Sequence, residues 1–276
     1  MAQADKRLKR YWHEMAWTDF QGLPDETVAI LPVGAVEQHG PHLPVYVDSC
    51  LNKELLDRAL GRAPESTNVV ALPLQVVGKS DEHIRFPGTL SLSAETLLGV
   101  LLDIGDSVAR AGIKRLVLLN SHGGQPQILD IVARELRARH KMLVVNAAWY
   151  ALGMPEGLFS ESECRHGIHG GEIETSLMLH LRPDLVDMAR AIDFVPLSIR
   201  MEREFDILQT EGGVGIGWQT QDLHPAGACG NAAAADAVRG AALAEHWVAR
   251  FLHLVNEVAR FPLDAFRDEP DAEAGQ

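Results

Sequence analysis

Short apolar runs alternate with amphipathic stretches along the first half of the chain. Runs rich in Val, Ile and Leu predict buried strands at residues 28–35, 69–74, 115–120 and 142–147. Stretches with helical spacing of apolar positions predict helices between these strands, at residues 50–62, 93–111 and 125–140. Strands that alternate with helices favour an α/β fold, with a mainly parallel β-sheet flanked by helices on both faces.

The second half of the chain is less regular. We expect an amphipathic helix at residues 172–181 and a long Ala-rich helix at residues 231–261. Between them, residues 192–228 are richer in Gly and Pro and have no clear period, which predicts long loops with short strands.

The two ends of the chain differ in character. Near the N-terminus, Tyr11 and Trp12 belong to an apolar stripe with helical spacing, which favours a docked amphipathic helix over a partner-binding one. Residues 268–276 form an acidic tail that we expect to be disordered. We find no linker or repeat, so we interpret residues 1–267 as a single domain.

Composition narrows the class of function. The 276 residues are 46% hydrophobic, enough to bury a large core, and the net charge of −13 argues against nucleic-acid and anionic-membrane partners. The three cysteines are too scattered for a disulfide framework. We see no apolar stretch of membrane-spanning length and no signal-type apolar core in residues 1–17. We therefore expect a cytoplasmic enzyme with a small-molecule substrate.

Side chains that can bind metal follow the first predicted strand. Glu37, His39, His42 and Asp48 lie within twelve residues of one another, directly after that strand. Carboxylates and imidazoles together are typical ligands of zinc, manganese and iron. Open α/β sheets bind ligands at the carboxyl ends of their strands, where these residues are expected to lie.

Three further polar clusters follow the same logic. They contain His83 in residues 81–88, His122 in residues 120–125, and His169 in the glycine-rich segment 166–176. One such residue is more often an ordinary loop residue than a ligand, but several that converge at one sheet edge would repel one another without a cation. The pattern therefore indicates a metal-dependent enzyme.

These segments resemble the creatininase (creatinine amidohydrolase) family. The matching segments follow the family's order: residues 31–42, Asp48, and residues 86–91, 118–124 and 169–179. The resemblance covers roughly residues 12–186 and is only loose beyond them. It implies an α/β fold with two divalent metal ions at the carboxyl ends of the strands. These ions are zinc or manganese, with iron as the third choice. It also implies a homo-oligomer, commonly a hexamer.

Carried over by position, the resemblance implies four metal ligands: Glu37 for one ion, His39 for the other, Asp48 bridging both, and His122. Creatinine-hydrolysing members have a further glutamate where this chain has Gly124. In members with this Gly-Gly form the Glu-Thr-Ser motif supplies the replacement, so we assign Glu174 as the last ligand, with Glu172 as the competing choice. These two glutamates are two residues apart and cannot share one helix face.

The resemblance also implies catalytic and substrate-binding residues. His169 matches the family histidine that carries a proton to the departing nitrogen, and we assign catalytic roles to His169 and Glu174. His42 and His83 could orient metal ligands or act directly. We assign substrate contacts to four positions: Trp149, Arg165, Gly123 and Gly124. Arg165 stands where creatininase has a substrate-covering tryptophan; it would suit a polar or anionic substrate, or be an exposed loop arginine.

The function implied is hydrolysis of a C–N amide bond, cyclic or formyl, by a hydroxide held between two metal ions. Family alternatives are creatinine hydrolysis itself, deformylation of a formylaminopyrimidine, peptide-bond cleavage in the maturation of a peptide-derived cofactor, and ring opening of a lactone or keto-inositol. A non-catalytic metal-binding member is the alternative from another class. The presence of His169 favours an enzyme, because binding alone needs no proton carrier.

Overall fold

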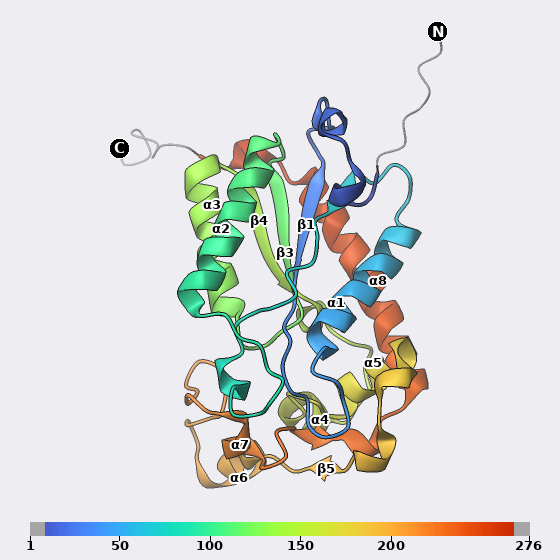
Figure 1. Cartoon of the computed structure of the whole chain (residues 1–276), viewed down its shortest axis with the longest axis vertical. Helices are drawn as coiled ribbons and strands as arrows, with labels where there is room; N and C mark the ends of the chain where they lie inside the picture. The colour runs from blue at the N-terminus through green and yellow to red at the C-terminus, as the bar shows by residue number, and fades with distance from the viewer. Residues whose placement is uncertain (1–8, 268–276) are drawn as a thin grey trace.

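The computed structural model describes residues 9–267, and its centre is a four-stranded parallel sheet (Figure 1). The strands are β1 (Val28–Val33), β2 (Val69–Ala71), β3 (Arg115–Asn120) and β4 (Leu143–Ala148). Their order across the sheet is β2-β1-β3-β4, and every neighbouring pair is parallel. The four predicted strands are therefore confirmed, although β2 ends three residues earlier than expected.

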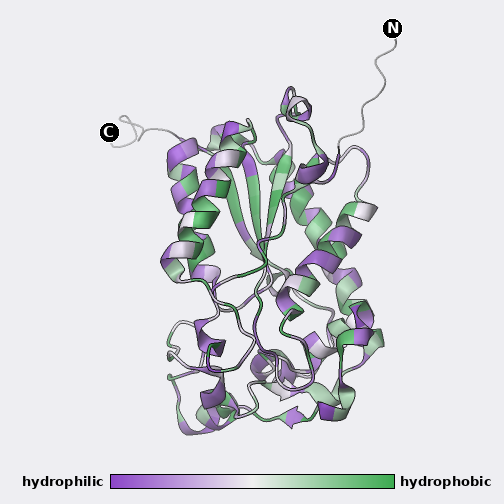
Figure 2. Cartoon of the chain, in the orientation of Figure 1, coloured by the Kyte–Doolittle hydropathy of each residue, from purple (hydrophilic) through white to green (hydrophobic). Residues whose placement is uncertain are grey.

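Helices cover both faces of this sheet, as predicted. The four long helices are α1 (Val47–Arg62), α2 (Ala94–Arg110), α3 (Pro126–His140) and α8 (Ala237–Arg260). Along β1, Val28 and Ile30 pack with the cluster of α1 and α8, while Ala29 and Leu31 pack with that of α2 and α3. Burial on both faces explains why β1 and β3 are continuous apolar runs, green in Figure 2.

The starts of α2 and α1 differ, because only α2 has a side-chain cap. The Ser93 hydroxyl accepts a hydrogen bond from the backbone N–H of Thr96 at 3.2 Å and caps α2, whose start was predicted at residue 93. In contrast, α1 begins at Val47, three residues before the predicted start, and has no side-chain cap. The earlier start places Asp48 in the first turn of α1.

The prediction of an amphipathic helix near the N-terminus was wrong, although the segment docks as expected. Instead of one amphipathic helix, the chain forms two 3₁₀ helices, Trp12–Glu14 and Trp17–Phe20. The aromatic residues still dock, because the Tyr11 hydroxyl donates to Asp57 Oδ1 at 2.7 Å and the Trp12 and Phe20 rings lie 4.5 Å apart. The disordered tail predicted for residues 268–276 lies outside the described residues.

The region expected to be loops and short strands also contains helices. These are α6 (Leu197–Glu204) and α7 (Thr220–Leu223), and β5 (Asp193–Phe194) pairs with β6 (Gly230–Asn231) in a small antiparallel sheet. In Figure 1 these elements lie in the lower half, beyond the ends of the central strands. Among the described residues, no helix combines the length and apolar character needed to cross a bilayer.

One close helix crossing gives a testable prediction about stability. A Cβ on Gly240 of α8 would lie 1.9 Å from the backbone oxygen of Ser176, in α5 (Glu172–Leu181). Gly240→Ala should therefore lower the free energy of unfolding by about 2 kcal/mol or more, because helix backbones would have to separate. Gly99 in α2 has open space around it, so Gly99→Ala should raise that free energy by about 0.5–1 kcal/mol. Urea denaturation measures the free energy of unfolding of both variants. Equal stability of the two variants would contradict the close approach of α8 to α5 at Gly240.

Candidate metal centre

The predicted metal-binding residues come together beyond the carboxyl ends of β1 and β3. Three groups of possible ligands have atoms within 4.8 Å of one another: Glu37, His39 and His169; Glu37, Glu82 and His122; and His39, Asp48 and Glu174. All five predicted metal ligands and His169 are among them. The convergence expected from the sequence is therefore present in the fold.

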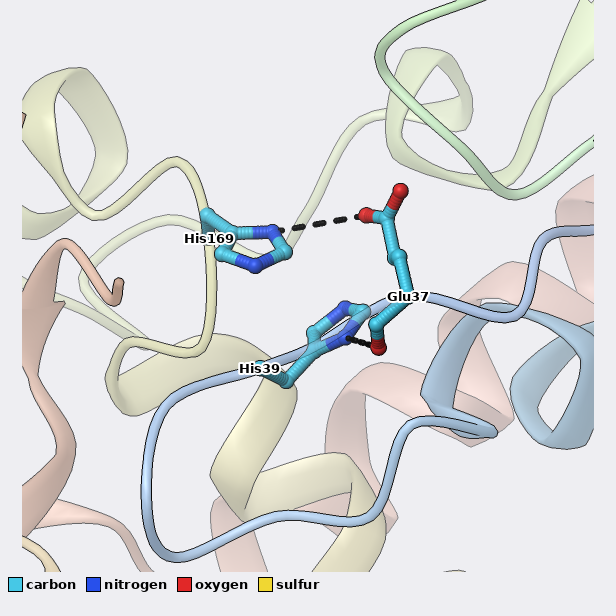
Figure 3. Close-up of side chains that lie close together, drawn as sticks. All are labelled: Glu37, His39 and His169. Carbon is cyan, nitrogen blue, oxygen red and sulfur yellow. Dashed lines mark hydrogen bonds and ion pairs between the residues drawn. The ribbon is translucent and has the colours of Figure 1, made fainter. Parts of the chain in front are cut away.

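One end of the centre is built around His39. Its Nδ1–H donates to the backbone oxygen of Glu37 at 3.0 Å (Figure 3), so Nε2 is the nitrogen that faces the centre. This Nε2 lies 3.7 Å from Asp48 Oδ2 and 3.7 Å from Glu174 Oε1. An imidazole nitrogen and two carboxylate oxygens therefore face one common point.

The other end is built around Glu37. Its Oε1 lies 3.2 Å from His122 Nδ1 and 3.6 Å from His169 Nδ1. The Nε2–H of His122 donates to the Lys79 carbonyl at 2.7 Å, so Nδ1 is the nitrogen of His122 that faces the centre. Asp48 Oδ2 lies 4.0 Å from the same Nδ1, so Asp48 stands between the two ends.

Several buried atoms of the centre have no hydrogen-bond partner. Glu37 Oε2, His39 Nε2 and Asp48 Oδ2 are unpartnered among the described residues, and all three side chains are buried. A buried carboxylate oxygen without a partner is strongly destabilising, and a bound cation removes that penalty. The residues present therefore fit divalent metal ions of the kind that carboxylate and imidazole ligands prefer.

Charges within the centre shift its protonation. Burial alone would lower the pKa of His39, but Glu174 and Asp48 raise this pKa to about 10. Despite burial, His39 lowers the pKa of Glu174 to about 2. Burial and repulsion from Glu37 raise the pKa of Asp48 well above its usual value. When no metal is bound, protons on His39 and Asp48 therefore offset the negative charge of the neighbouring carboxylates. Metal ions would displace these protons.

His169 faces the same space with a free nitrogen. Its Nε2–H donates to the backbone oxygen of Gln38 at 2.7 Å, and its Nδ1 points toward Glu37 (Figure 3). Burial and the nearby His39 lower the pKa of His169 to about 4. At neutral pH the ring is uncharged, so its Nδ1 can accept a proton.

The start of α5 separates the two competing glutamates. Glu174 Oε1 faces His39, and its Oε2 accepts the backbone N–H of Gly170 at 2.5 Å. Glu172 instead pairs with Arg239 of α8, and its backbone N–H donates to Glu163 Oε1 at 2.6 Å. Geometry therefore favours Glu174 over Glu172 at the centre.

His42 and His83 contact neighbours of these residues. The Gln38 side-chain amide donates to His83 Nδ1 at 2.9 Å, so the Nε2–H of His83 faces Glu37 Oε1 at 3.3 Å. His42 Nε2 lies 2.9 Å from the Thr175 hydroxyl on α5. Both positions suit residues that orient ligands, and the choice between this role and direct catalysis stays a prediction.

The predicted substrate contacts lie in different surroundings. Trp149 is only 2% exposed, packs on Phe251 and donates its indole N–H to Asn52 Oδ1 at 3.1 Å, so it belongs to the core in this structure. Gly123 is exposed, whereas Gly124 lies against Glu82 and His122. For these three positions a substrate contact stays a prediction.

Arg165 lies in α4 (Glu161–His166) and pairs with Glu202 Oε1 at 2.6 Å. Its exposed side chain lines an open cavity of about 610 Å³, together with His166 and Glu211. Among the described residues, those that line this cavity include none of the metal-site groups. The cavity and the metal centre therefore have separate linings.

Sequence reasoning missed two residues of the site. Gln38 is buried and donates to His83 and to the Gly227 carbonyl, so it ties three loops together. Glu82 Oε1 lies 3.3 Å from His122 Nε2. Their positions in the sequence could have indicated both residues. Gln38 stands between Glu37 and His39, and Glu82 stands directly before His83.

Comparison with known proteins identifies the family. A family profile described as "Creatininase: Creatinine amidohydrolase" matches residues 13–255, which is most of the chain. The chain belongs to the creatininase family. A creatinine amidohydrolase of Pseudomonas putida is 36% identical over 203 residues, which are 67% of this chain and 76% of that protein. A mycofactocin precursor peptide peptidase of Mycobacterium ulcerans is 32% identical over 237 residues, 82% of this chain and 84% of the relative.

Solved creatininase structures are similar over nearly the whole chain. A structure titled "Creatininase Mn" has a TM-score of 0.74 at 27% identity, covering 91% of this chain and 100% of the other. A zinc–zinc form of a creatininase mutant has a TM-score of 0.73 at 28% identity, covering 91% and 99%. The predicted family, the α/β fold and the prediction of a hydrolytic enzyme are therefore confirmed.

Proposed function

We propose that this creatininase-family protein hydrolyses a C–N amide bond of a small molecule, cyclic or formyl, using two divalent ions, zinc or manganese. The observation that carries the proposal is the set of unpartnered buried atoms, Glu37 Oε2, His39 Nε2 and Asp48 Oδ2, within one cluster of carboxylates and imidazoles. Manganese and zinc–zinc forms of creatininase support the choice of metal.

The ligands divide between the two ends of the centre. Glu37 and His122 would hold one ion, and His39 and Glu174 the other. Asp48 lies between both ends and would bridge them. Such ions activate water and polarise a substrate carbonyl.

Proton transfer would be carried out by side chains of the protein. The Gln38 carbonyl holds His169 Nε2–H, so the lone pair of His169 Nδ1 is directed at the centre. This Nδ1 would take a proton from the attacking water and deliver it to the departing nitrogen, which must be protonated to leave. Glu174 is held by the Gly170 N–H and would keep its Oε1 directed toward His39.

Substrate recognition and assembly extend the proposal. Arg165 and the cavity it lines would bind a polar or anionic group of the substrate. Backbone amides of Gly123 and Gly124, in the turn beside His122, would contact the substrate near the reacting bond. We also propose a homo-oligomer, as the family resemblance implies, and a cytoplasmic location, as the few scattered cysteines favour. We propose no nucleic-acid or membrane partner, as the net charge of −13 favours.

A second candidate is cleavage of a peptide bond. The mycofactocin precursor peptide peptidase aligns with 82% of this chain, more than the 67% aligned with the creatinine amidohydrolase. The relatives also include a 3-dehydro-scyllo-inosose hydrolase of Thermotoga maritima, 26% identical over 64% of this chain. The same metal centre would serve these reactions, so the substrate must be found by assay.

The test is metal content joined to activity. We expect elemental analysis of untagged protein, purified without chelators, to find about two ions per chain. Chelation should abolish hydrolysis, and added zinc or manganese should restore it. The substrate panel should contain creatinine, other cyclic amides, formamides, a lactone and short peptides. Metal-free protein that takes up neither ion would contradict the proposal.

A further inference from the structure

A buried carboxylate joins two segments beside the metal centre. Glu163 of α4 is 5% exposed and binds backbone N–H groups with both oxygens. Its Oε1 accepts the N–H of Glu172, the first residue of α5, at 2.6 Å. Its Oε2 accepts the N–H of Asn231 in β6 at 3.0 Å. We propose that Glu163 is a positioning residue that holds His169 and Glu174 in place at the centre, an inference that rests on the proposed function.

The start of α5 depends on this carboxylate. Gly171 directly precedes the helix and offers no side chain, so α5 has no side-chain cap from this residue. The first N–H groups of a helix need acceptors, and a negative charge beside them is favourable. The same first turn carries Glu174, whose Oε1 faces His39 and whose Oε2 accepts the Gly170 N–H. By supplying an acceptor from α4, Glu163 fixes the backbone that orients this proposed ligand.

The second contact of the carboxylate fixes the other side of His169. The His169 carbonyl accepts the N–H of Cys229 at 2.7 Å, and Cys229 directly precedes β6. By binding Asn231 in β6, Glu163 joins this strand to the segment that contains His169. The Gln38 carbonyl holds the His169 ring at Nε2, so a shift of the His169 backbone would turn Nδ1 away from the centre.

Three glycines make room for Glu163. A Cβ at Gly167 would lie 2.0 Å from Glu163 Oε1, and Cβ atoms at Gly171 and Gly230 would lie 2.4 Å and 2.8 Å from it. At Gly167 the three nearest atoms all belong to the Glu163 carboxylate, and the φ of this glycine is −81°. Available space, and not backbone conformation, therefore calls for glycine at this position.

The contacts of Glu163 predict which steps its loss would affect. They support Glu174, a proposed ligand at the His39 end, and His169, the proposed proton carrier. The His122 end is held by contacts from other loops. Loss of Glu163 should therefore weaken the ion at the His39 end and slow proton transfer, and it should leave the other ion bound.

Two measurements test the proposal: calorimetric titration of the metal-free full chain with manganese chloride, and rates on the substrate that the panel identifies. Glu163→Gln keeps the size of the side chain but replaces one acceptor oxygen with an NH₂ donor. We expect one of the two ions to bind about 10-fold more weakly in this variant. At saturating manganese, kcat should fall about 10-fold with little change in KM.

Ser93→Ala is the matched control for a purely structural cap. It removes the hydroxyl that caps α2, which packs on the opposite face of the sheet from α5. Loss of such a cap should lower the unfolding midpoint and leave kcat and both manganese affinities unchanged. If Glu163→Gln behaves like this control, Glu163 is only a structural residue and the proposal is overturned.

Gly167→Ala displaces the carboxylate without removing it. Its Cβ would occupy the place of Glu163 Oε1, so it should weaken the same ion and lower kcat as Glu163→Ala does. The double variant Glu163→Ala/Gly167→Ala should be no worse than Glu163→Ala, because both changes act through one contact. Fully additive losses would contradict the proposal.

Circular dichroism verifies that each variant is folded. If Glu163→Ala does not fold, Glu163→Gln and Gly167→Ala still decide, because unchanged manganese binding and kcat in both would overturn the proposal. If the natural protein binds no manganese, the proposed function itself fails, so the two failures are distinguishable.

Discussion

Asp48→Ala is expected to remove both metal ions and to lower the hydrolysis rate by at least about 10³-fold while leaving the protein folded. Asp48 Oδ2 lies 3.7 Å from His39 Nε2 and 4.0 Å from His122 Nδ1, so its loss affects both ends of the centre. Its buried carboxylate has no partner for Oδ2 among the described residues, so the metal-free fold gains little from it. The metal-free variant should therefore be at least as resistant to unfolding as the metal-free natural protein.

Metal content and initial rates, measured on the same preparations, check this expectation. Asp57→Ala is the matched control, because Asp57 lies on the same helix and contacts Tyr11 and Lys53 instead of the centre. The control should keep both ions and the full rate. An Asp48→Ala enzyme with undiminished activity would rule out a centre bridged by this residue.

Much of the fold could be predicted because its signal is local. Strands β1 and β3 are buried on both faces, so their apolar runs stand out from the amphipathic helices between them. Ser93 marked the start of α2 through its own hydroxyl. The helix prediction for the segment around Tyr11 and Trp12 was wrong, because aromatic residues with helical spacing can also dock from short 3₁₀ turns. Contacts with residues distant in the sequence, such as Asp57, decide between the two conformations.

The candidate site shows the same division. Glu37, His39 and Asp48 could be found from one short segment of sequence, since all three follow a single buried strand. Glu82 could not, because its place depends on the absence of a side chain at Gly124, on another loop. Trp149 illustrates the converse: a large apolar side chain suits a substrate pocket or a core, and only its contacts with Phe251 and Asn52 place it in the core.

His169→Ala is expected to lower the hydrolysis rate by about 10²–10⁴-fold with both metal ions retained. The reason is the position of His169 Nδ1, which faces Glu37 Oε1 at 3.6 Å while the Gln38 carbonyl holds the opposite nitrogen. The low pKa of about 4, caused by burial and His39, keeps the ring neutral and able to accept a proton at pH 7. Rates and metal content should be measured on the same preparations, because the prediction is a lower hydrolysis rate with unchanged metal binding.

Added imidazole should partly restore the rate of this variant, since it can occupy the vacated space and carry the proton. His180→Ala is the control, because His180 lies on α5 and contacts Arg58, and it should keep the full rate. A His169→Ala enzyme that lost an ion would make His169 a metal ligand, as its grouping with Glu37 and His39 permits. An unaltered rate would instead assign the proton to another group that faces the centre, and His83, whose Nε2 lies 3.3 Å from Glu37 Oε1, would be the next to test.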